Sequence, residues 1–145
     1  KIFVWLALHD RLWTADHLTR RQLEHPDCCV LCAQEEENLN HMLLGCSFAR
    51  EVWYNVLLIW RLHRRIPTPT NTIREWWPTL SNAVPSRSRR KVNTIGLVFR
   101  FLWLERNRRV FDKIALMPHV VASNIRSEFQ LWTKAKLGGL ARDIT

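Results

Sequence analysis

The amino-acid sequence predicts an all-α protein, made of a small helical module followed by a basic helical region. Apolar residues recur at spacings of three and four, which is typical of one buried face of a helix. Glycine occurs 4 times and proline 6 times in 145 residues, too few for a turn-dense sheet protein or a disordered chain. Hydrophobic residues make up 47% of the chain and include eight tryptophans, so a packed core is expected.

The first part of the chain is expected to form three helices around an irregular segment. A short apolar helix is predicted over residues 1–9, and a second helix over about 14–24, where Pro26 prevents continuation. Residues 28–45 are predicted to be irregular. A long helix then covers about 47–63, where the apolar positions follow the i, i+3, i+4, i+7 stripe and the tryptophans are interpreted as core residues.

The second part begins with a linker over residues 67–71, by its proline, threonine and asparagine content. Thr72 is expected to cap a short helix that Pro78 ends or kinks, and residues 81–88 are predicted to form a loop. This linker divides the chain into a zinc-binding domain over 1–66, whose metal motif is described below, and a basic C-terminal region over 67–145.

Two further helices are predicted in the C-terminal region. The longest covers about residues 89–112 and keeps its apolar positions on one face. The last helix starts at Pro118, since proline suits the first helical position, and is expected to end at Gly138-Gly139.

Charge is distributed unevenly between the two regions. The formal net charge is +9, from 22 lysines and arginines against 13 acidic residues. Residues 1–66 contain eight basic and eight acidic residues, so the other 14 basic and 5 acidic residues place the whole excess after Ile66. This asymmetry indicates a polyanionic partner for the second region, and a highly soluble, solvated face is the alternative that charge leaves open.

The start of the chain gives no sign of membrane insertion. The apolar run over residues 2–8 is too short to span a bilayer, and no small-residue cleavage site follows it. Because the sequence begins at Lys1, we take it as a fragment or processed piece. We expect an intracellular protein, in the nucleus or the cytoplasm, without membrane contact.

Cysteine and histidine gather in the irregular segment at the spacing of metal ligands. Two residues separate Cys29 from Cys32, eight separate Cys32 from His41, and four separate His41 from Cys46. A C-x2-C turn directs two thiolates to a centre about 2.3 Å from a zinc ion, and one imidazole and a third thiolate complete a tetrahedron. Soft thiolates favour zinc over hard cations. The sequence therefore predicts one structural Zn²⁺ ion bound by Cys29, Cys32, His41 and Cys46.

Alternatives exist for one ligand and for the chemistry of the cluster. Cys28 competes with Cys29, but three residues between Cys28 and Cys32 would break the tight turn, so Cys28 is interpreted as a spare thiol. Two disulfides would be typical of a secreted domain, but the sequence shows no signal peptide. A redox C-x2-C site usually opens a helix next to a strand, and no strand is predicted here.

His41 and Cys46 cannot both face a metal from an unbroken helix. Positions five apart are rotated by roughly 500°, which leaves them about 140° out of alignment. We expect a helical turn over residues 40–44 that Gly45 ends in the left-handed conformation, so that Cys46 starts the long helix. Residues 35–37, three glutamates, are expected to form a solvated acidic loop, with one accepting a hydrogen bond near the metal.

Several further segments surround the metal motif in a fixed order. They are Phe3-Val4-Trp5-Leu6-Ala7, Arg11-Leu12-Trp13-Thr14, Leu18 with Arg20-Arg21, Cys29-Val30-Leu31-Cys32, Glu37-Asn38-Leu39-Asn40-His41, Leu44-Gly45-Cys46, Phe48-Ala49-Arg50 and Val52-Trp53. This combination resembles the reverse-transcriptase zinc-binding domain of plant LINE-type (non-LTR) retrotransposon proteins. Residues 101–111 and Trp132 more loosely resemble the region that often follows that domain.

The resemblance implies the C-terminal part of a retroelement polyprotein, or a host protein derived from one, whose parent contains a reverse-transcriptase core. Ala33 stands where similar zinc knuckles often have glycine. The eight-residue gap before His41 differs from the four-residue gap of retroviral nucleocapsid knuckles. The paired catalytic aspartates of a polymerase have no counterpart, so we expect a non-catalytic protein.

Three functions are compatible with these features. The first is a zinc-binding module that binds RNA or DNA through phosphates, which the charge asymmetry favours. The second is a structural or protein–protein interaction module with tryptophan anchors. The third is a decayed retroelement fragment without a role.

The candidate phosphate-binding residues are basic residues near the ends of the longest predicted helix: Arg87, Arg89, Arg90, Lys91, Arg106, Arg108 and Arg109, with Arg100 and Lys113 as further candidates. Replacing Arg106, Arg108 and Arg109 together by glutamine is expected to weaken binding and leave the fold intact. Trp76 and Trp77 are expected to be buried rather than stacked on bases.

Overall fold

The computed structural model describes residues 6–9, 11–84 and 89–144, with side chains omitted at 89–95, 133 and 135–144. Within these residues the protein is helical and has no strand, which confirms the predicted all-α class. The main helices are α2 (Ala15–Arg20), α3 (Ser47–Leu58), α4 (Ile73–Ala83), α5 (Arg89–Asn107) and α6 (Pro118–Ile144). The shorter elements are the π-helix η1 (His41–Gly45), the 3₁₀-helix η2 (His63–Arg65) and the π-helix η4 (Arg108–Asp112).

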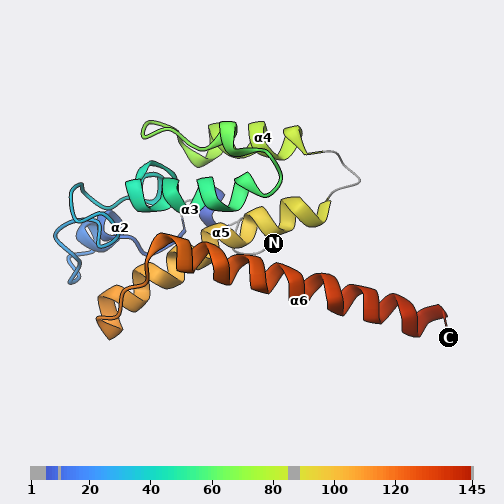
Figure 1. Ribbon diagram of the computed structural model, residues 1–145. Helices are drawn as coiled ribbons and strands as arrows, with labels where there is room; N and C mark the ends of the chain where they lie inside the picture. Colours follow the sequence, from blue (N-terminus) through green and yellow to red (C-terminus); the bar gives the residue numbers. More distant parts are fainter. Residues whose placement is uncertain (1–5, 10, 85–88, 145) are drawn as a thin grey trace.

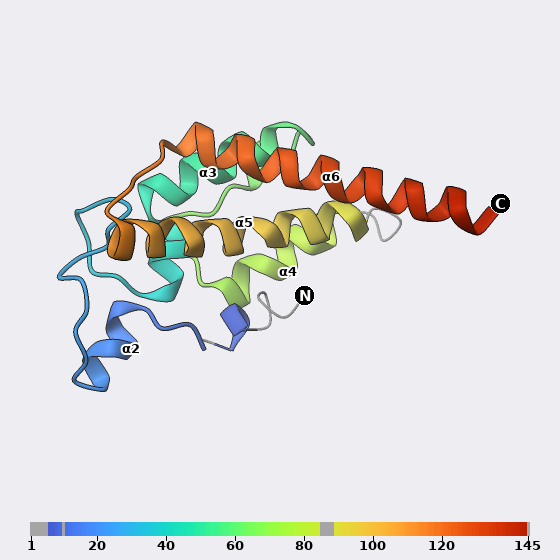
Figure 2. The same cartoon turned by 90° about the horizontal axis from the view of Figure 1, so that it is seen from below.

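Three long helices form the body of the molecule. Helices α3, α5 and α6 pack against one another, and α4 lies on the far side of α3 from α6 (Figure 1). The C-terminal half of α6 extends beyond the body in both views, whereas α2 lies at the opposite end (Figures 1 and 2). The cysteine-containing loop runs between α2 and η1, so the metal motif lies at the end where α5 finishes.

Trp53 of α3 and Trp76 of α4 lie at the centre of the core, as predicted. The Trp53 ring centroid lies 4.7 Å from that of Trp76 and 5.4 Å from that of Phe99, both in edge-to-face geometry. The indole N–H of Trp53 donates to the Leu43 carbonyl at 2.8 Å, and that of Trp76 donates to the Arg65 carbonyl at 3.0 Å. Burying each indole with its N–H satisfied avoids the cost of an unpaired polar group.

The buried apolar residues form one cluster that extends from Ala7 to Ile125 and includes residues on both sides of Ile66. Packing between the two predicted regions therefore contributes to the stability of each. The division at Ile66 stays a prediction of the sequence.

Several predicted helix boundaries differ from the structure. Of the helix expected over 1–9, residues 6–8 are helical, and 1–5 lie outside the described residues. Helix α2 ends at Arg20, before Gln22 takes a positive φ of 57°. Helix α3 ends at Leu58 rather than near residue 63, and Arg61 also has a φ of 57°.

The helix ends predicted at Gly138-Gly139 and, as one of two alternatives, at Pro78 are absent, and a kink at Pro78 stays a prediction. Helix α4 continues through Pro78 to Ala83, so the expected loop over 81–88 begins later, and residues 85–88 lie outside the described residues. Helix α6 continues through Gly138 and Gly139 to Ile144. Glycine inside a helix costs only about 1 kcal/mol, which favourable neighbours can offset.

The predicted helix over 89–112 is present, but it changes type at its end. Helix α5 passes into the π-helix η4 at Arg108, and Lys113 ends it in the left-handed conformation with a φ of 57°. Among the described residues, no helix is long and apolar enough to cross a membrane.

Candidate metal centre

A tight turn brings the first two cysteines together. The Ala33 N–H donates to the Cys29 carbonyl at 2.7 Å, and the Cys29 N–H donates to the Glu35 carbonyl at 2.7 Å. Ala33 has a φ of 57°, a left-handed conformation that costs an L-residue about 1–2 kcal/mol. The turn therefore uses alanine where glycine would fit without strain.

The chain returns to the centre through the π-helix η1 rather than through a left-handed glycine. The Cys46 N–H donates to the His41 carbonyl at 2.7 Å, five residues back, which places the two residues one turn apart on the same side. The prediction of a left-handed Gly45 is wrong, because no glycine among the described residues has a positive φ. Gly45 is needed for close packing instead: a Cβ atom there would lie 2.8 Å from the Pro69 carbonyl oxygen.

The four predicted ligand side chains converge at one point. The ligand atoms of Cys29, Cys32, His41 and Cys46 all lie within 4.8 Å of one another. The Cys29 and Cys46 sulfurs are 3.9 Å apart, and the Cys32 sulfur lies 3.3 Å from His41 Nε2. Thiolates arranged tetrahedrally at about 2.3 Å from zinc would be ~3.8 Å apart, so the observed spacing fits zinc.

The chemistry of this donor set is that of a closed structural site. Cys29 and Cys46 have no exposed surface and His41 is 8% exposed, whereas Cys32 is half-buried, so three of the four ligands are buried. Four protein ligands leave no position for a substrate or water. The group can therefore hold one zinc ion, and Cys28 lies outside it as a half-buried free thiol.

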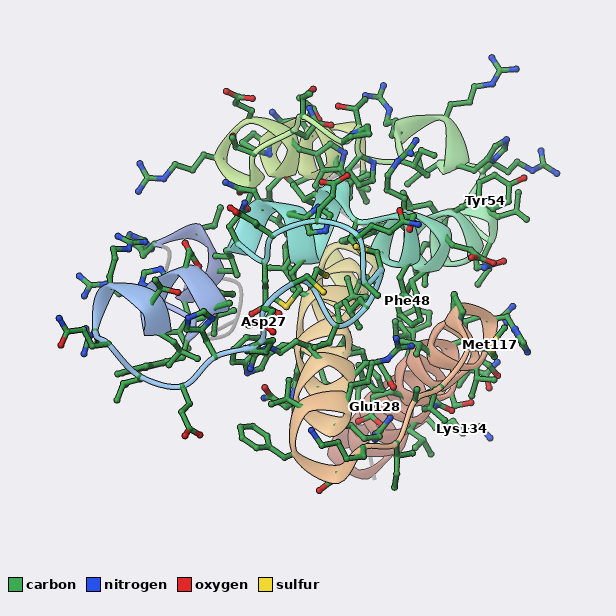
Figure 3. The ribbon with its side chains drawn as sticks, turned by 90° about the vertical axis from the view of Figure 1, so that its left-hand side faces the viewer. Asp27, Phe48, Tyr54, Met117, Glu128 and Lys134 are labelled. Atoms are coloured by element: carbon green, nitrogen blue, oxygen red, sulfur yellow. The ribbon has the colours of Figure 1, made fainter. Side chains whose placement is uncertain are left out.

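The alternative of disulfide bonds does not match the structure, in which all four cysteines are free. A disulfide needs sulfurs about 2.05 Å apart, and the Cys29 and Cys46 sulfurs are separated by 3.9 Å. Figure 3 shows the side chains at this end of the molecule, where Phe48 marks the start of α3 and Asp27 the approach to the cysteine-containing loop.

Hydrogen bonds link the donors of this cluster and shift their pKa values. The hydrogen bond to Cys46, together with burial, raises the pKa of the Cys29 thiol to about 12. The same hydrogen bond lowers the pKa of the Cys46 thiol, and the backbone N–H groups of Ala49 and Phe48 at the start of α3 act in the same direction. The hydrogen bond to Cys29 raises the pKa of His41 to about 9. Zinc would displace these protons, because it binds thiolates and neutral imidazole.

A carboxylate orients the histidine from outside the cluster. Glu35 Oε2 lies 3.3 Å from His41 Nδ1, while Nε2 faces the sulfurs. An acceptor at one ring nitrogen fixes the tautomer that leaves the other nitrogen free for the metal. The side chain of Glu35 is 69% exposed, in agreement with the predicted solvated loop.

Residues 1–53 match the family model described as zinc-binding in reverse transcriptase. The resemblance predicted from the sequence is confirmed over these residues, and the matched region is a zinc-binding, non-catalytic one. No curated protein and no solved structure matches the chain. The plant origin and the LINE type stay predictions.

A buried ion pair joins this zinc-binding region to α5. Glu37 was expected in the solvated loop, but its side chain has no exposed surface and that of Arg106 is 3% exposed. Arg106 Nη2 donates to Glu37 Oε1 at 2.8 Å, and Arg106 Nε donates to Oε2 at 3.0 Å. Glu37 Oε1 also accepts from the Ala15 N–H at 2.7 Å. One carboxylate thus connects the loop, the start of α2 and α5.

A second arginine holds the C-x2-C turn itself. Arg109 Nη1 donates to the carbonyls of Val30 and Leu31 at 3.1 and 3.3 Å, and Nη2 donates to the Leu116 carbonyl at 2.9 Å. Its guanidinium carbon lies 4.6 Å above the Phe48 ring. The π-helix η4, which follows α5, therefore fixes the backbone between Cys29 and Cys32.

The guanidinium groups of Arg106 and Arg109 are both engaged inside the fold, and their phosphate role stays a prediction. Arg108 differs, since its side chain is 37% exposed and its contact with Glu105 is a longer 3.4 Å. Nothing in the local sequence distinguishes these three arginines. The Trp103 ring centroid lies 5.1 Å from the guanidinium carbon of Arg106, but the presence of Trp103 in the sequence does not show which of the three arginines is buried.

The remaining candidate residues are placed as follows. Arg87 lies outside the described residues, and the side chains of Arg89, Arg90 and Lys91 in the first turn of α5 are not described. Arg100 and Lys113 are exposed. Trp76 is buried, and Trp77 is half-buried against Phe99, at a centroid distance of 5.3 Å.

Proposed function

We propose that this chain is a non-catalytic zinc module that binds RNA or DNA through phosphates on its basic C-terminal region. The observation that carries the proposal is the charge distribution: residues 67–145 contain 14 basic and 5 acidic residues, whereas residues 1–66 are neutral. Arginine and lysine that neutralise phosphates release condensed counterions, which drives binding to any nucleic-acid sequence.

The proposed binding surface follows α5 and α6. The first turn of α5, with Arg89, Arg90 and Lys91, lies alongside the middle of α6 in both views (Figures 1 and 2). On α6 the side chains of Arg126 and Lys134 are exposed. The surface excludes Arg106 and Arg109, whose charges are used within the fold.

The zinc ion has a structural part in this function. The closed four-ligand centre fixes the loop that Glu37 and Arg106 tie to α5. Metal binding in such a site contributes directly to folding free energy. The zinc-binding region therefore supports α5 without itself supplying the phosphate contacts proposed here.

A salt titration of the zinc-loaded chain with single-stranded and duplex oligonucleotides tests the proposal. The observed binding constant should fall with salt, with a log–log slope of about −0.7 to −0.9 for each phosphate neutralised. Replacing Arg89, Arg90 and Lys91 by glutamine should lower the affinity and reduce the slope by up to about 2–3.

The matched control replaces Arg61, Arg64 and Arg65, which are exposed residues of the neutral region, by glutamine. It removes the same charge and should leave the slope nearly unchanged. Equal effects of the two triple variants would show that only the overall net charge matters. Absence of binding at low salt would refute the proposal.

A structural or protein–protein interaction role is the second candidate. An apolar groove of about 290 Å³ between α3 and α6 favours it, with Val56, Ile59, Trp60, Ile125 and Phe129 in its lining. The partner implied by the family match is the reverse-transcriptase core of a parent protein. If the folded, zinc-loaded chain binds neither nucleic acid nor that core, this result would support the hypothesis that it is a decayed retroelement fragment.

A further inference from the structure

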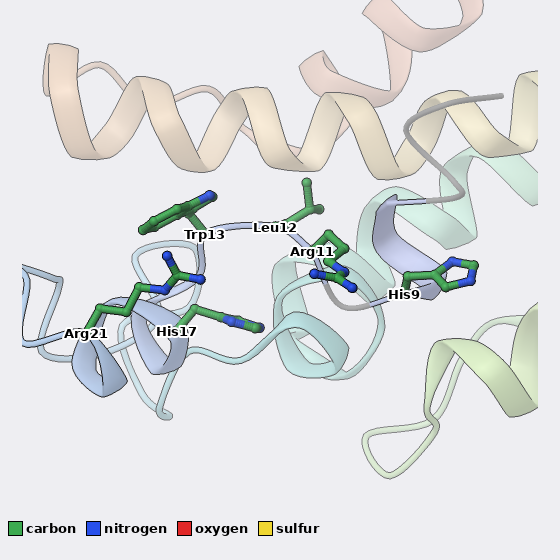
Figure 4. A pocket seen from close by; sticks show the side chains of 6 residues that line it. All are labelled: His9, Arg11, Leu12, Trp13, His17 and Arg21. Atoms are coloured by element: carbon green, nitrogen blue, oxygen red, sulfur yellow. The ribbon is translucent and has the colours of Figure 1, made fainter.

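A second concave site lies within the zinc-binding region, away from the metal. It is a pocket of about 230 Å³ between the segment that precedes α2 and α2 itself, and its lining consists of His9, Arg11, Leu12, Trp13, His17 and Arg21. In Figure 4, Arg21, the residue that follows α2, reaches to the Trp13 ring, His17 projects from α2, and Arg11 lies on the segment that precedes α2. Five of the six lining side chains are basic or aromatic.

Within the part of the chain that the structure describes, no acidic side chain neutralises the arginines of this pocket, Arg11 and Arg21. Asp16, which lies on α2, is engaged by the Arg20 guanidinium at 3.3 Å and by the Thr14 hydroxyl group. The pocket therefore concentrates positive charge in a region whose net charge is zero.

The aromatic residue of the pocket is available to a ligand. Trp13 is 47% exposed, although most tryptophans of the core are buried or half-buried. The guanidinium carbon of Arg21 lies 4.5 Å from its ring centroid, a cation–π contact that holds the charge beside the indole. An exposed aromatic ring next to guanidinium groups is the combination that binds a base and its phosphate in single-stranded nucleic acid.

We propose that this pocket binds one nucleotide of a single-stranded nucleic acid, with the phosphate on Arg11 and Arg21 and the base against Trp13. A single strand is required because a base in a duplex is stacked on its neighbours and cannot reach the indole. This contact lies outside the basic C-terminal region and does not depend on the phosphate binding proposed there.

Titration of the zinc-loaded chain with thymidine monophosphate, inorganic phosphate and thymidine tests this site. The Trp13 indole N–H is followed by NMR and assigned through Trp13→Phe. Thymidine monophosphate should shift this resonance and bind at least about fivefold more tightly than inorganic phosphate, since base stacking contributes ~1 kcal/mol or more. Equal affinity for the nucleotide and for phosphate would refute the nucleotide assignment.

Variants separate the pocket from general electrostatics. Arg11→Gln combined with Arg21→Gln should weaken nucleotide binding at least tenfold and leave zinc content and helicity intact, because both side chains are exposed. The control, Arg61→Gln combined with Arg64→Gln, removes the same charge from exposed positions outside the pocket and should bind normally. Similar losses in both double variants, or no shift of the Trp13 resonance, would overturn the proposal.

The glutamine variant of Arg89, Arg90 and Lys91 distinguishes this site from the C-terminal one. It should bind thymidine monophosphate as the unmodified chain does, even where its affinity for long oligonucleotides is reduced. Loss of nucleotide binding in this variant would show that the nucleotide binds at α5 and not in the pocket.

Discussion

The buried ion pair between Glu37 and Arg106 provides the sharpest test of how the zinc-binding region is held on α5. Replacing Arg106 by methionine keeps most of the side-chain volume but removes the charge and every donor to the carboxylate. Glu37 would then be buried without a counterion, keeping only the Ala15 N–H as a partner. Removing one partner of a buried pair typically costs about 3–5 kcal/mol.

The geometry supports the upper part of this range. Arg106 makes two short contacts with Glu37, at 2.8 and 3.0 Å, and the two side chains are 3% and 0% exposed. The control, Arg108→Met, removes a 3.4 Å contact whose arginine side chain is 37% exposed, and should cost less than about 1 kcal/mol because solvent screens it. For a domain with a free energy of unfolding of about 5–15 kcal/mol, Arg106→Met would remove a large share of that free energy and Arg108→Met only a small one.

Urea unfolding of the zinc-loaded variants, followed by circular dichroism, measures both free energies. A double variant with Arg106→Met and Glu37→Gln should cost less than the sum of the single changes, because neither residue then remains as an unpaired buried charge. If Arg106→Met and Arg108→Met destabilised the protein equally, or if the single changes were additive, the ion pair would not hold the two parts together.

Three further outcomes are expected. Gly45→Ala should lower the free energy of unfolding by about 1–3 kcal/mol, because the new Cβ would meet the Pro69 carbonyl at 2.8 Å; an unchanged urea midpoint would contradict this. Ala33→Gly should raise the unfolding free energy by roughly 0.5–1 kcal/mol through relief of the left-handed strain, and destabilisation would count against that turn geometry. Metal analysis should find one zinc per chain in Cys28→Ser but not in Cys29→Ser, and chelation should loosen the region around the site; equal zinc loss in both variants would show that Cys28 also contributes.

The sequence by itself determined the features that depend only on residues close together along the chain or on composition. Helical stripes follow from side-chain spacing, so the class of the fold and most helices were predictable from the positions of apolar residues. Metal ligands must lie within a few ångströms of each other, and short loops impose this through sequence spacing. For this reason the spacing of the motif from Cys29 to Cys46 is enough to indicate zinc. The charge asymmetry is likewise a property of the sequence.

Local signals were misleading where packing competes with them. Pro78 was expected to end or kink a helix and Gly138-Gly139 to end one, yet α4 and α6 continue through these residues. Gly45 was expected to supply a left-handed turn, whereas the π-helix makes the turn and the glycine admits the Pro69 backbone. In each case the residue type marked an unusual position in the chain, but its role depends on packing contacts with residues that are distant in the sequence.

Only the tertiary structure decided which charged residues serve the fold and which face solvent. Arg106, Arg108 and Arg109 are nearly adjacent and chemically alike, but the first pairs with Glu37, 69 positions away, and the last clamps the turn at Val30 and Leu31. The same packing gathers Arg11, Trp13 and Arg21 around one pocket in a region of zero net charge. The physical reason is that burial and pairing depend on which surfaces the helices bring together, and neither is encoded in the spacing of residues along one helix.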